Sequence, residues 1–233
     1  MSSVVNLAWI ILTTEDTEST EVAQSWFPLV ILKDSQQTRA QAAAVIARGG
    51  VIAFRTDTFY GLGADPFNRA AVKRIRELKG REEIKPLLVV ISDSHQVERL
   101  IQEKSQEFDL LAERFWPGPL TLIGRGCNLV PEEVTAGTGT IGVRLPDDRE
   151  VRSLVLACGG ALTATSANPS GREPAKTASE VWDYFGDQLD LIIDGGSARA
   201  ERPSTVVDVT GGAPRLIREG VIPWHDIQDV THP

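Results

Sequence analysis

The sequence predicts an α/β fold, with an open, twisted sheet of mixed parallel and antiparallel strands flanked by helices in a single domain. Helical patterns alternate with short β-rich runs along the chain, which is typical of this class. Two of the short runs, 141–145 and 206–209, lack a helix on one side, so the sheet is expected to be mixed rather than purely parallel. The 233 residues, 42% of them hydrophobic, fit one large domain with a sizeable core.

The elements are predicted from periodicity and from helix start and stop signals. Residues 38–48 have a helical pattern that stops at Gly49-Gly50. Asn68 is a residue type that caps helices, and apolar residues follow it at helical spacing. The continuous apolar run Leu87–Ile91 is typical of a buried strand. The remaining predicted helices are 97–101, 108–115, 148–158 and 177–185, and the remaining predicted strands are 51–54, 120–123, 141–145, 161–165, 191–193, 206–209 and 216–218.

Both ends of the chain are predicted to lie outside the folded domain. We expect an N-terminal extension at residues 1–33, the domain at 34–222 and a C-terminal tail at 223–233. Residues 7–12 form an apolar run, but no basic stretch precedes it and no small-residue cleavage site follows it. The run is also too short to span a bilayer, so neither a secretory signal nor a membrane segment is expected.

Composition narrows the functional classes. Cys127 and Cys158 are far apart and predict no disulfide framework or thiolate metal site, so a reducing, cytoplasmic location is expected. The three histidines lie in unrelated contexts, which argues against a His-rich metal centre. A formal net charge of −8 disfavours general nucleic-acid coating. A local basic cleft stays open, because positive charge is concentrated at Lys73, Arg74, Arg76, Lys79, Arg81 and Lys85.

The strongest functional signal pairs Lys79-Gly80-Arg81 with Ser166-Ala167-Asn168. The first follows a predicted helix, and the second follows an apolar strand. Cations and small hydroxyl or amide donors at these positions suit a phosphate-bearing ligand. The alternative for the basic residues is a solvated helix end, where cations favour the helix dipole. Lys85 stands before Pro86 and a buried strand, which would fix this loop against the core.

Other candidate residues lie near strand ends. The hydroxyl-rich segment Thr56–Gly63 follows a strand and suits a ligand loop, although a tight turn explains it equally well. Arg144 lies in an apolar strand and needs an anionic partner, either a structural carboxylate or a substrate carboxylate. Ser204 and Arg218 lie near two further strand ends, where a capping serine and a surface arginine are the simpler interpretations. The glycines of residues 137–142 match a dinucleotide-binding pattern, but a strand follows them where a helix is required.

Taken in order, these segments resemble the YrdC-type threonylcarbamoyl-AMP synthase family from about residue 38 to about residue 222. Arg55 departs from the family pattern, which usually has proline there, and so does Glu82-Glu83 after Arg81. The matching segments are Thr56–Gly63, Lys79-x-Arg81 with Lys85-Pro86-Leu87, Phe115–Thr121, Gly142–Pro146, Ser166-x-Asn168-x-Ser170-Gly171, Ser204–Asp208 and Arg218-x-Gly220.

The resemblance implies a YrdC-like open twisted sheet and an enzyme that makes threonylcarbamoyl-AMP and pyrophosphate from L-threonine, bicarbonate or CO2, and ATP. Mg²⁺ would be carried by the phosphates rather than by protein side chains. The product would pass to a downstream tRNA threonylcarbamoyl-transfer complex, with tRNA itself bound weakly if at all and no membrane involved. An RNA-binding module on the same cationic face, or a paralogue with another substrate, stays open.

The resemblance also assigns roles to individual residues. Lys79 and Arg81 would be catalytic, by stabilising charge on the triphosphate. The threonine-binding residues would be Thr58, Arg144 and Ser204, and the ATP-binding residues would be Arg81, Lys85, Thr140, Ser166, Asn168 and Arg218.

Overall fold

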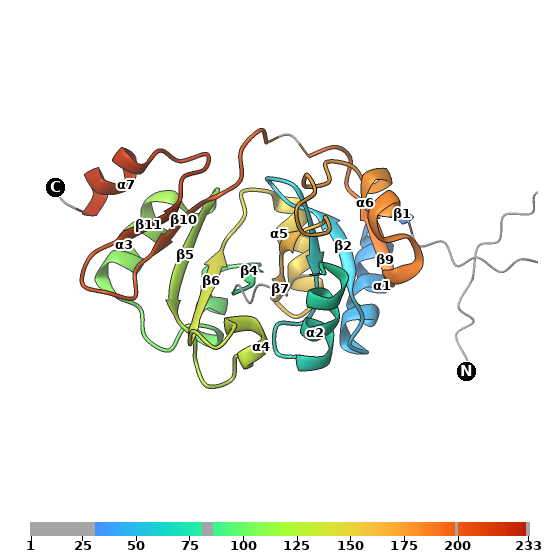
Figure 1. The fold of residues 1–233 in the computed structure, drawn as a ribbon, viewed down its shortest axis with the longest axis horizontal. Coiled ribbons are helices and arrows are strands. Elements are labelled where there is room, and N and C mark those ends of the chain that lie inside the picture. Colours follow the sequence, from blue (N-terminus) through green and yellow to red (C-terminus); the bar gives the residue numbers. More distant parts are fainter. Residues whose placement is uncertain (1–30, 81–85, 199, 232–233) are drawn as a thin grey trace, which may run out of the picture.

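The computed structural model describes residues 31–80, 86–198 and 200–231. Its strands form two mixed sheets flanked by helices, which confirms the predicted α/β class (Figure 1). The strands are divided between two sheets, where a single sheet was expected. The five-stranded sheet has the order β1 (Ile31–Lys33), β9 (Leu191–Asp194), β2 (Ile52–Arg55), β3 (Tyr60–Gly63) and β8 (Thr165–Ser166). The six-stranded sheet has the order β11 (Arg215–Arg218), β10 (Thr205–Asp208), β5 (Leu120–Arg125), β6 (Thr140–Arg144), β4 (Leu88–Ile91) and β7 (Ala161–Thr163).

Most helices begin at a side chain that caps the first turn. Asn68 accepts a hydrogen bond from the Ala71 amide, as its residue type predicted, and Ser35 and Asp148 cap two others. In the part of the chain described, no helix is long and apolar enough to cross a membrane. The helices are α1 (Gln36–Ala47), α2 (Arg69–Leu78), η1 (Ser94–Arg99), α3 (Gln106–Phe115), α4 (Glu132–Thr135), α5 (Arg149–Ala157), α6 (Ala178–Phe185), η2 (Gly186–Gln188) and α7 (Trp224–Thr231).

Several elements differ from the sequence prediction. The helix expected at 97–101 is the 3₁₀ turn η1, a form that is common in short connections. Residues 60–63, expected in a ligand loop, form β3. The strand contains Gly63 because a Cβ atom at this position would come within 2.7 Å of the Phe54 ring. Residues 31–33 form the edge strand β1, although they were placed in the N-terminal extension. Residues 224–231, placed in the C-terminal tail, form α7, whose Ile227 is fully buried in the main core.

The two sheets meet where one predicted strand is divided. Residues 161–165 were expected to form a single strand, but β7 pairs with β4 of the larger sheet and β8 pairs with β3 of the smaller one. Between them, the Ala164 amide still donates to the Leu88 carbonyl. The Thr163 hydroxyl accepts from the Ala64 amide and donates to the Leu62 carbonyl, so it ties this crossing to the neighbouring sheet.

The six-stranded sheet has one apolar face and one polar face. On the apolar face, Leu122 pairs with Val143, and both are fully buried in the core that includes Phe108 and Leu111 of α3. Because side chains alternate along a strand, the intervening residues share the opposite face. We define this polar face as Leu88, Thr121, Ile123, Thr140, Gly142, Arg144 and Val206, which the strand registers place together. Leu88, Ile123, Thr140 and Val206 are only half-buried, so the face is partly open.

Candidate functional site

Arg144 lies on the polar face at the end of β6 and is almost fully buried, with 2% of its side chain exposed. Its Nη2 lies 3.1 Å from Oδ1 of Asp57, and its Nη1 donates to the Thr58 hydroxyl at 3.4 Å. Burial lowers the pKa of Arg144, which the Asp57 carboxylate partly offsets. Its Nε has no hydrogen-bond partner among the described residues. A guanidinium has five donors, so Arg144 retains capacity for a second anion.

Asp57 was not among the residues predicted from the sequence. It lies in the turn between β2 and β3, beside the predicted Thr58, with 10% of its side chain exposed. Burial raises its pKa, and the positive charge of Arg144 acts in the opposite direction. Neither of its oxygens accepts a hydrogen bond of good geometry within the described residues. Asp57 is the one carboxylate in the hydroxyl-rich segment Thr56–Gly63, which follows a strand. That position could have identified it from the sequence.

Arg55, where the family usually has proline, supports the same corner. Its Nη2 lies 2.8 Å from Oδ2 of Asp148, the residue that caps α5. Asp148 in turn contributes to the raised pKa of Asp57. The departure from the family pattern therefore places an additional ion pair next to Asp57.

Ser204 and Arg218 form the other half of this site. The Ser204 hydroxyl lies 3.0 Å from the Thr121 hydroxyl, and Arg218 Nη2 donates to the Ser204 carbonyl at 2.9 Å. Partial desolvation of its guanidinium lowers the pKa of Arg218, although the residue as a whole is exposed, and the positive charge of Arg144 acts in the same direction. Two guanidiniums that repel each other are stabilised when an anion binds between them. The corner that Arg144, Ser204 and Arg218 share is therefore suited to a carboxylate or phosphate.

Lys79, Ser166 and Asn168 form a second cluster. Lys79 follows α2 and is 1% exposed, and its Nζ donates to the Ser166 carbonyl and, at 2.8 Å, to the Asn168 carbonyl. The Ser170 amide donates back to the Lys79 carbonyl. Two segments almost ninety residues apart, predicted to act together, are thus in direct contact. The predicted residues Arg81 and Lys85 lie outside the described residues.

Thr140 lies apart from both clusters, at the start of β6. It shares the polar face with Arg144, four positions further along, which corresponds to about 13 Å in a strand. Gly142 lies between them and adds no side chain to this face, and a Cβ atom there would meet Thr121 at 3.1 Å. A ligand that reaches from Thr140 to Arg144 would lie along the strand, on the half-buried apolar residues of the polar face.

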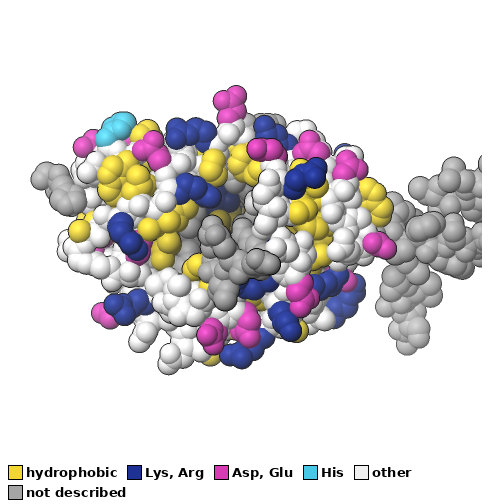
Figure 2. Space-filling model, viewed as in Figure 1, with side chains coloured by type: hydrophobic (Ala, Val, Ile, Leu, Met, Phe, Trp, Pro, Cys, Tyr) yellow, Lys and Arg dark blue, Asp and Glu magenta, His cyan; other side chains and the backbone are white. Residues whose placement is uncertain are grey.

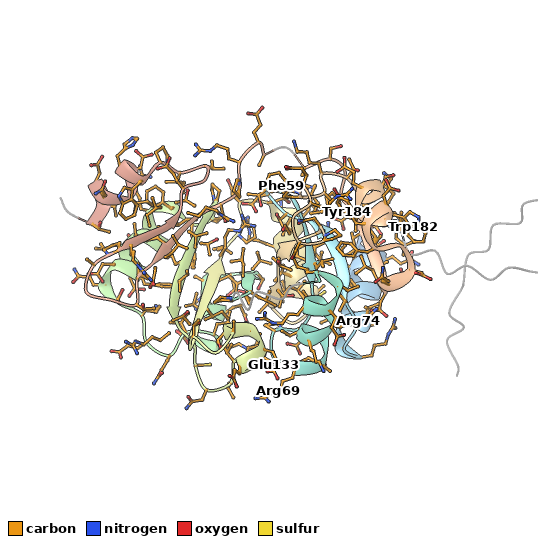
Figure 3. The ribbon with its side chains drawn as sticks, in the orientation of Figure 1. Phe59, Arg69, Arg74, Glu133, Trp182 and Tyr184 are labelled. Carbon is orange, nitrogen blue, oxygen red and sulfur yellow. The ribbon has the colours of Figure 1, made fainter. Side chains whose placement is uncertain are left out.

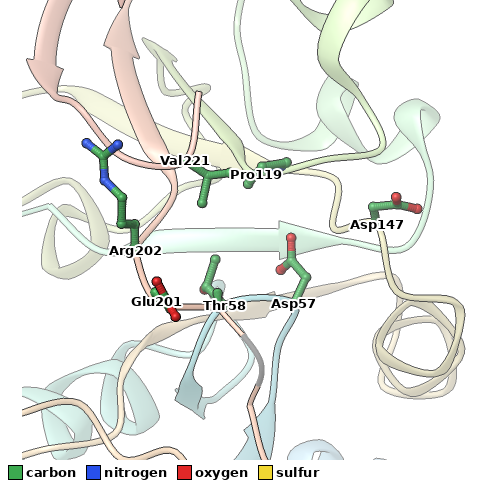
Figure 4. A pocket seen from close by; sticks show the side chains of 8 residues that line it. Asp57, Thr58, Pro119, Asp147, Glu201, Arg202 and Val221 are labelled. Carbon is green, nitrogen blue, oxygen red and sulfur yellow. The ribbon is translucent and has the colours of Figure 1, made fainter. Parts of the chain in front are cut away.

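A cavity of about 440 Å³ lies beside Asp57 and Thr58, a size that suits a small ligand. Figure 4 shows these two residues on one side of the space, with Pro119 and Val221 across from them. Asp147, before α5, and the segment before β10 contribute the rest of the wall. The Tyr60 hydroxyl anchors that segment by donating to the Gly196 carbonyl at 2.8 Å. The lining residues are Asp57, Thr58, Pro119, Asp147, Ala200, Glu201, Arg202 and Val221.

Tyr60→Phe should test this anchor. The lost hydrogen bond is expected to lower the free energy of unfolding by about 1 kcal/mol near neutral pH. Burial raises the pKa of Tyr60 from 10.0 to about 12. Above pH 10 the unfolded wild type ionises first and the wild type loses stability, which the phenylalanine variant cannot do. Denaturant titrations should therefore show the difference in unfolding free energy between wild type and variant shrinking between pH 10 and 12 and then changing sign, since a shift of about two pKa units outweighs about 1 kcal/mol. A constant difference would contradict the assignment.

The cations on α2 are mostly paired with acidic groups. Arg69 approaches Glu133 of α4 at 3.6 Å (Figure 3). Arg74 forms an ion pair with Asp190. Lys73 faces a glutamate one turn further along α2 at 3.9 Å. Figure 2 shows a face hollowed near its centre, with basic side chains around the hollow and acidic ones interspersed over the surface. The charge on α2 is therefore a weak basis for an extended RNA-binding surface.

The fold and the site describe an α/β protein in which the buried Arg144 and the adjoining cavity suit a small anionic or zwitterionic ligand beside a polar sheet face. The family model Sua5_yciO_yrdC, described as "Telomere recombination", matches residues 44–220. The chain therefore belongs to the Sua5/YciO/YrdC family, which confirms the resemblance stated from the sequence.

Named relatives extend this result. A threonylcarbamoyl-AMP synthase of Pyrococcus abyssi is 41% identical over 189 residues, which cover 81% of this chain but only 56% of the relative. The chain thus spans little more than half the length of that protein. A threonylcarbamoyl-AMP synthase of Halorhodospira halophila is 38% identical over 172 residues, which cover 74% of this chain and 90% of the relative.

Solved structures agree with this fold. A crystal structure of Pyrococcus abyssi Sua5 complexed with L-threonine has a TM-score of 0.81 and 39% sequence identity, over 86% of this chain and 59% of that one. The structure of Escherichia coli YciO has a TM-score of 0.73 and 28% identity, over 83% of this chain and 95% of that one.

Proposed function

We propose that this chain synthesises threonylcarbamoyl-AMP from L-threonine, bicarbonate or CO2, and ATP, with release of pyrophosphate. The observation that carries the proposal is the buried Arg144, held against Thr58 and Asp57 beside a cavity, in a chain whose relatives bear the name of this enzyme. A related protein has been crystallised with L-threonine, which supports the choice of amino acid.

Arg144, Thr58 and Ser204 are proposed to bind threonine. The Arg144 fork can hold the threonine carboxylate by two parallel hydrogen bonds. The Thr58 hydroxyl already contacts Arg144, and Ser204 reaches the same corner through its contact with Thr121. These groups would orient the amine toward CO2 and then hold the carbamate for its attack on ATP.

ATP is proposed to lie along the polar face, with its nucleoside toward Thr140. The carbamate oxygen attacks the α-phosphorus, and pyrophosphate leaves. No protein nucleophile is needed, so catalysis consists of positioning and of stabilising the developing charge. Arg218, Ser166 and Asn168 would contact the nucleotide, and Lys79 would hold their turn in place. Arg81 and Lys85 complete this set as predictions from sequence, and Mg²⁺ would arrive bound to the phosphates.

The product would serve a downstream tRNA threonylcarbamoyl-transfer complex in the cytoplasm, because a mixed anhydride of this kind is an activated acyl donor. Two alternatives remain distinct from this proposal. An RNA-binding module is disfavoured by the paired cations of α2. A paralogue with another substrate would agree with the likeness to YciO, whose sequence identity is lower than that of the synthases.

The reaction gives a direct test. Purified protein with ATP should release pyrophosphate only when both threonine and bicarbonate are present, and a threonine-containing adenylate should accumulate by mass spectrometry. Omitting threonine is the control. Pyrophosphate release that does not depend on threonine would favour the paralogue, and no release together with RNA binding would favour the RNA-binding module.

A further inference from the structure

Threonine carries two charged groups on its α-carbon, an ammonium and a carboxylate, and Arg144 accounts for only the carboxylate. The carboxylate and the ammonium of an α-amino acid lie close together, so the complementary site is a cation beside an anion. In this structure Arg144 and Asp57 are that pair, 3.1 Å apart, with Asp57 lining the cavity. The residues assigned so far leave the ammonium group without a negatively charged partner.

We propose that Asp57 is a catalytic residue, whose carboxylate binds the α-ammonium of threonine and takes the proton released as the carbamate forms. The role rests on the proposed function. Nine-tenths of the side chain is buried, and neither oxygen accepts a hydrogen bond of good geometry within the described residues, although the backbone amides of Asp57 and Asp147 act on it weakly. A buried carboxylate with unused acceptors and one ion-pair partner can accommodate a second cation.

The proton balance requires one acceptor. The ammonium passes one proton to Asp57, and bicarbonate dissociates into CO2 and hydroxide. The free amine then attacks the carbon of CO2, the N–C bond forms, and one C=O pair moves onto oxygen. The second proton of the amine joins the hydroxide to make water. Threonine, bicarbonate and the ionised carboxylate thus give the carbamate, water and protonated Asp57.

The surroundings suit this proton transfer. Burial raises the pKa of Asp57, which brings it closer to the range in which a carboxylate works as a base. The charged groups around it come from each neighbouring element. They are Arg144 on β6, Arg55 at the end of β2, Asp147 and Asp148 before α5, Glu201 and Arg202 on the cavity wall, and Arg218 on β11.

A ligand without the ammonium group tests the contact. Titration calorimetry would compare threonine with 3-hydroxybutyrate, which has the same carboxylate and hydroxyl. Wild-type protein should prefer threonine by at least about 30-fold, the value of a good charge-assisted contact. Asp57→Asn should reduce this preference to about threefold or less. Asp147→Asn is the matched control, because this second carboxylate of the cavity is 74% exposed and should leave the preference unchanged.

The outcomes separate the competing roles. If Asp57→Asn weakens both ligands equally, Asp57 only positions Arg144 and the proposal is wrong. If Asp147→Asn removes the preference as well, the acidity of the whole cavity is responsible and the proposal is also wrong. Wild-type protein that binds neither ligand would overturn the threonine assignment itself, which identifies the proposed function as the point of failure.

Two further measurements address folding and the proton. In wild type the preference for threonine should fall as the pH is lowered and Asp57 protonates, and a pH-independent preference would overturn the proposal without any variant. In the full reaction, Asp57→Asn should reduce the rate by about 100- to 10,000-fold at neutral pH, the range for loss of a general base. The ratio of the variant rate to the wild-type rate should rise toward acid pH, because protonation removes the base from wild type only. The pH dependence of the CO2–bicarbonate equilibrium affects both rates equally and therefore cancels in this ratio.

Discussion

Arg144→Ala is expected to weaken threonine binding by about 30- to 1000-fold, the loss of roughly 2–4 kcal/mol for a bidentate charge-assisted contact. ATP binding measured without threonine should change much less. Arg218→Ala should have the reverse effect, because Arg218 is proposed to serve the nucleotide. Arg144→Lys should restore little, since an ammonium cannot reproduce the planar guanidinium. Titration calorimetry on folded variants provides the measurement.

Stability must be controlled separately for Arg144. Its removal leaves Asp57 buried without a cation, which typically costs about 3–5 kcal/mol. A double variant, Arg144→Met with Asp57→Asn, removes both charges. Its free energy of unfolding should be close to that of wild type, while it should fail to bind threonine. Unchanged threonine affinity in Arg144→Ala would mean that Asp57 is only a structural partner and that threonine binds elsewhere.

Lys79→Met is expected to reduce both stability and activity. Its Nζ donates to the carbonyls of Ser166 and Asn168. The Ser166 carbonyl would keep the Asn168 amide as a donor, so only the Asn168 carbonyl would lose its partner, at a cost of about 1–3 kcal/mol. The free energy of unfolding should therefore fall by about 1–3 kcal/mol. Pyrophosphate release should fall by about 100- to 1000-fold, because the turn would no longer hold its donors in place for the nucleotide.

Lys73→Met is the matched control for Lys79. Lys73 lies on α2 one and a half turns earlier, is exposed, and pairs with Glu77 at 3.9 Å. An exposed pair of this kind contributes about 0–1 kcal/mol, so this variant should keep near wild-type stability and rate. Denaturant unfolding and the pyrophosphate assay would be run on both. A Lys79→Met protein as stable and active as Lys73→Met would place Lys79 outside the site.

The sequence predicted the order of most elements because their signals are local. Asn68 caps its helix with its own side chain, and the apolar run before Ser92 forms a buried strand because each residue is apolar. β3 could not be predicted in this way, since its glycines disfavour strands, and the approach of Phe54 that requires glycine at position 63 is a tertiary contact. The division of 161–165 between two sheets depends on pairing with strands about 75 and 100 residues away in the chain.

The candidate site shows the same difference. Arg144 could be predicted because a cation in an apolar strand requires an anion, whereas the identity of that anion depends on a turn more than eighty residues earlier. Lys79 was interpreted as a cation for phosphate. Its ammonium donates to two backbone carbonyls, an interaction that no local sequence pattern reveals. Asp57 was missed because the hydroxyls on either side of it dominated the interpretation of that segment.

The crossing at Ala164 has a mechanical consequence. The Ala164 amide is hydrogen-bonded to Leu88 in one sheet, and the next residue, Thr165, pairs with Leu62 in the other. The chain therefore passes from one sheet to the other without a residue whose backbone angles are unconstrained. A hinge needs such residues. The crossing therefore holds the two sheets firmly together at this point. The segment before β10 is held differently, by the phenolic hydroxyl of Tyr60, which donates to the Gly196 carbonyl, so we expect movement around the cavity to occur there.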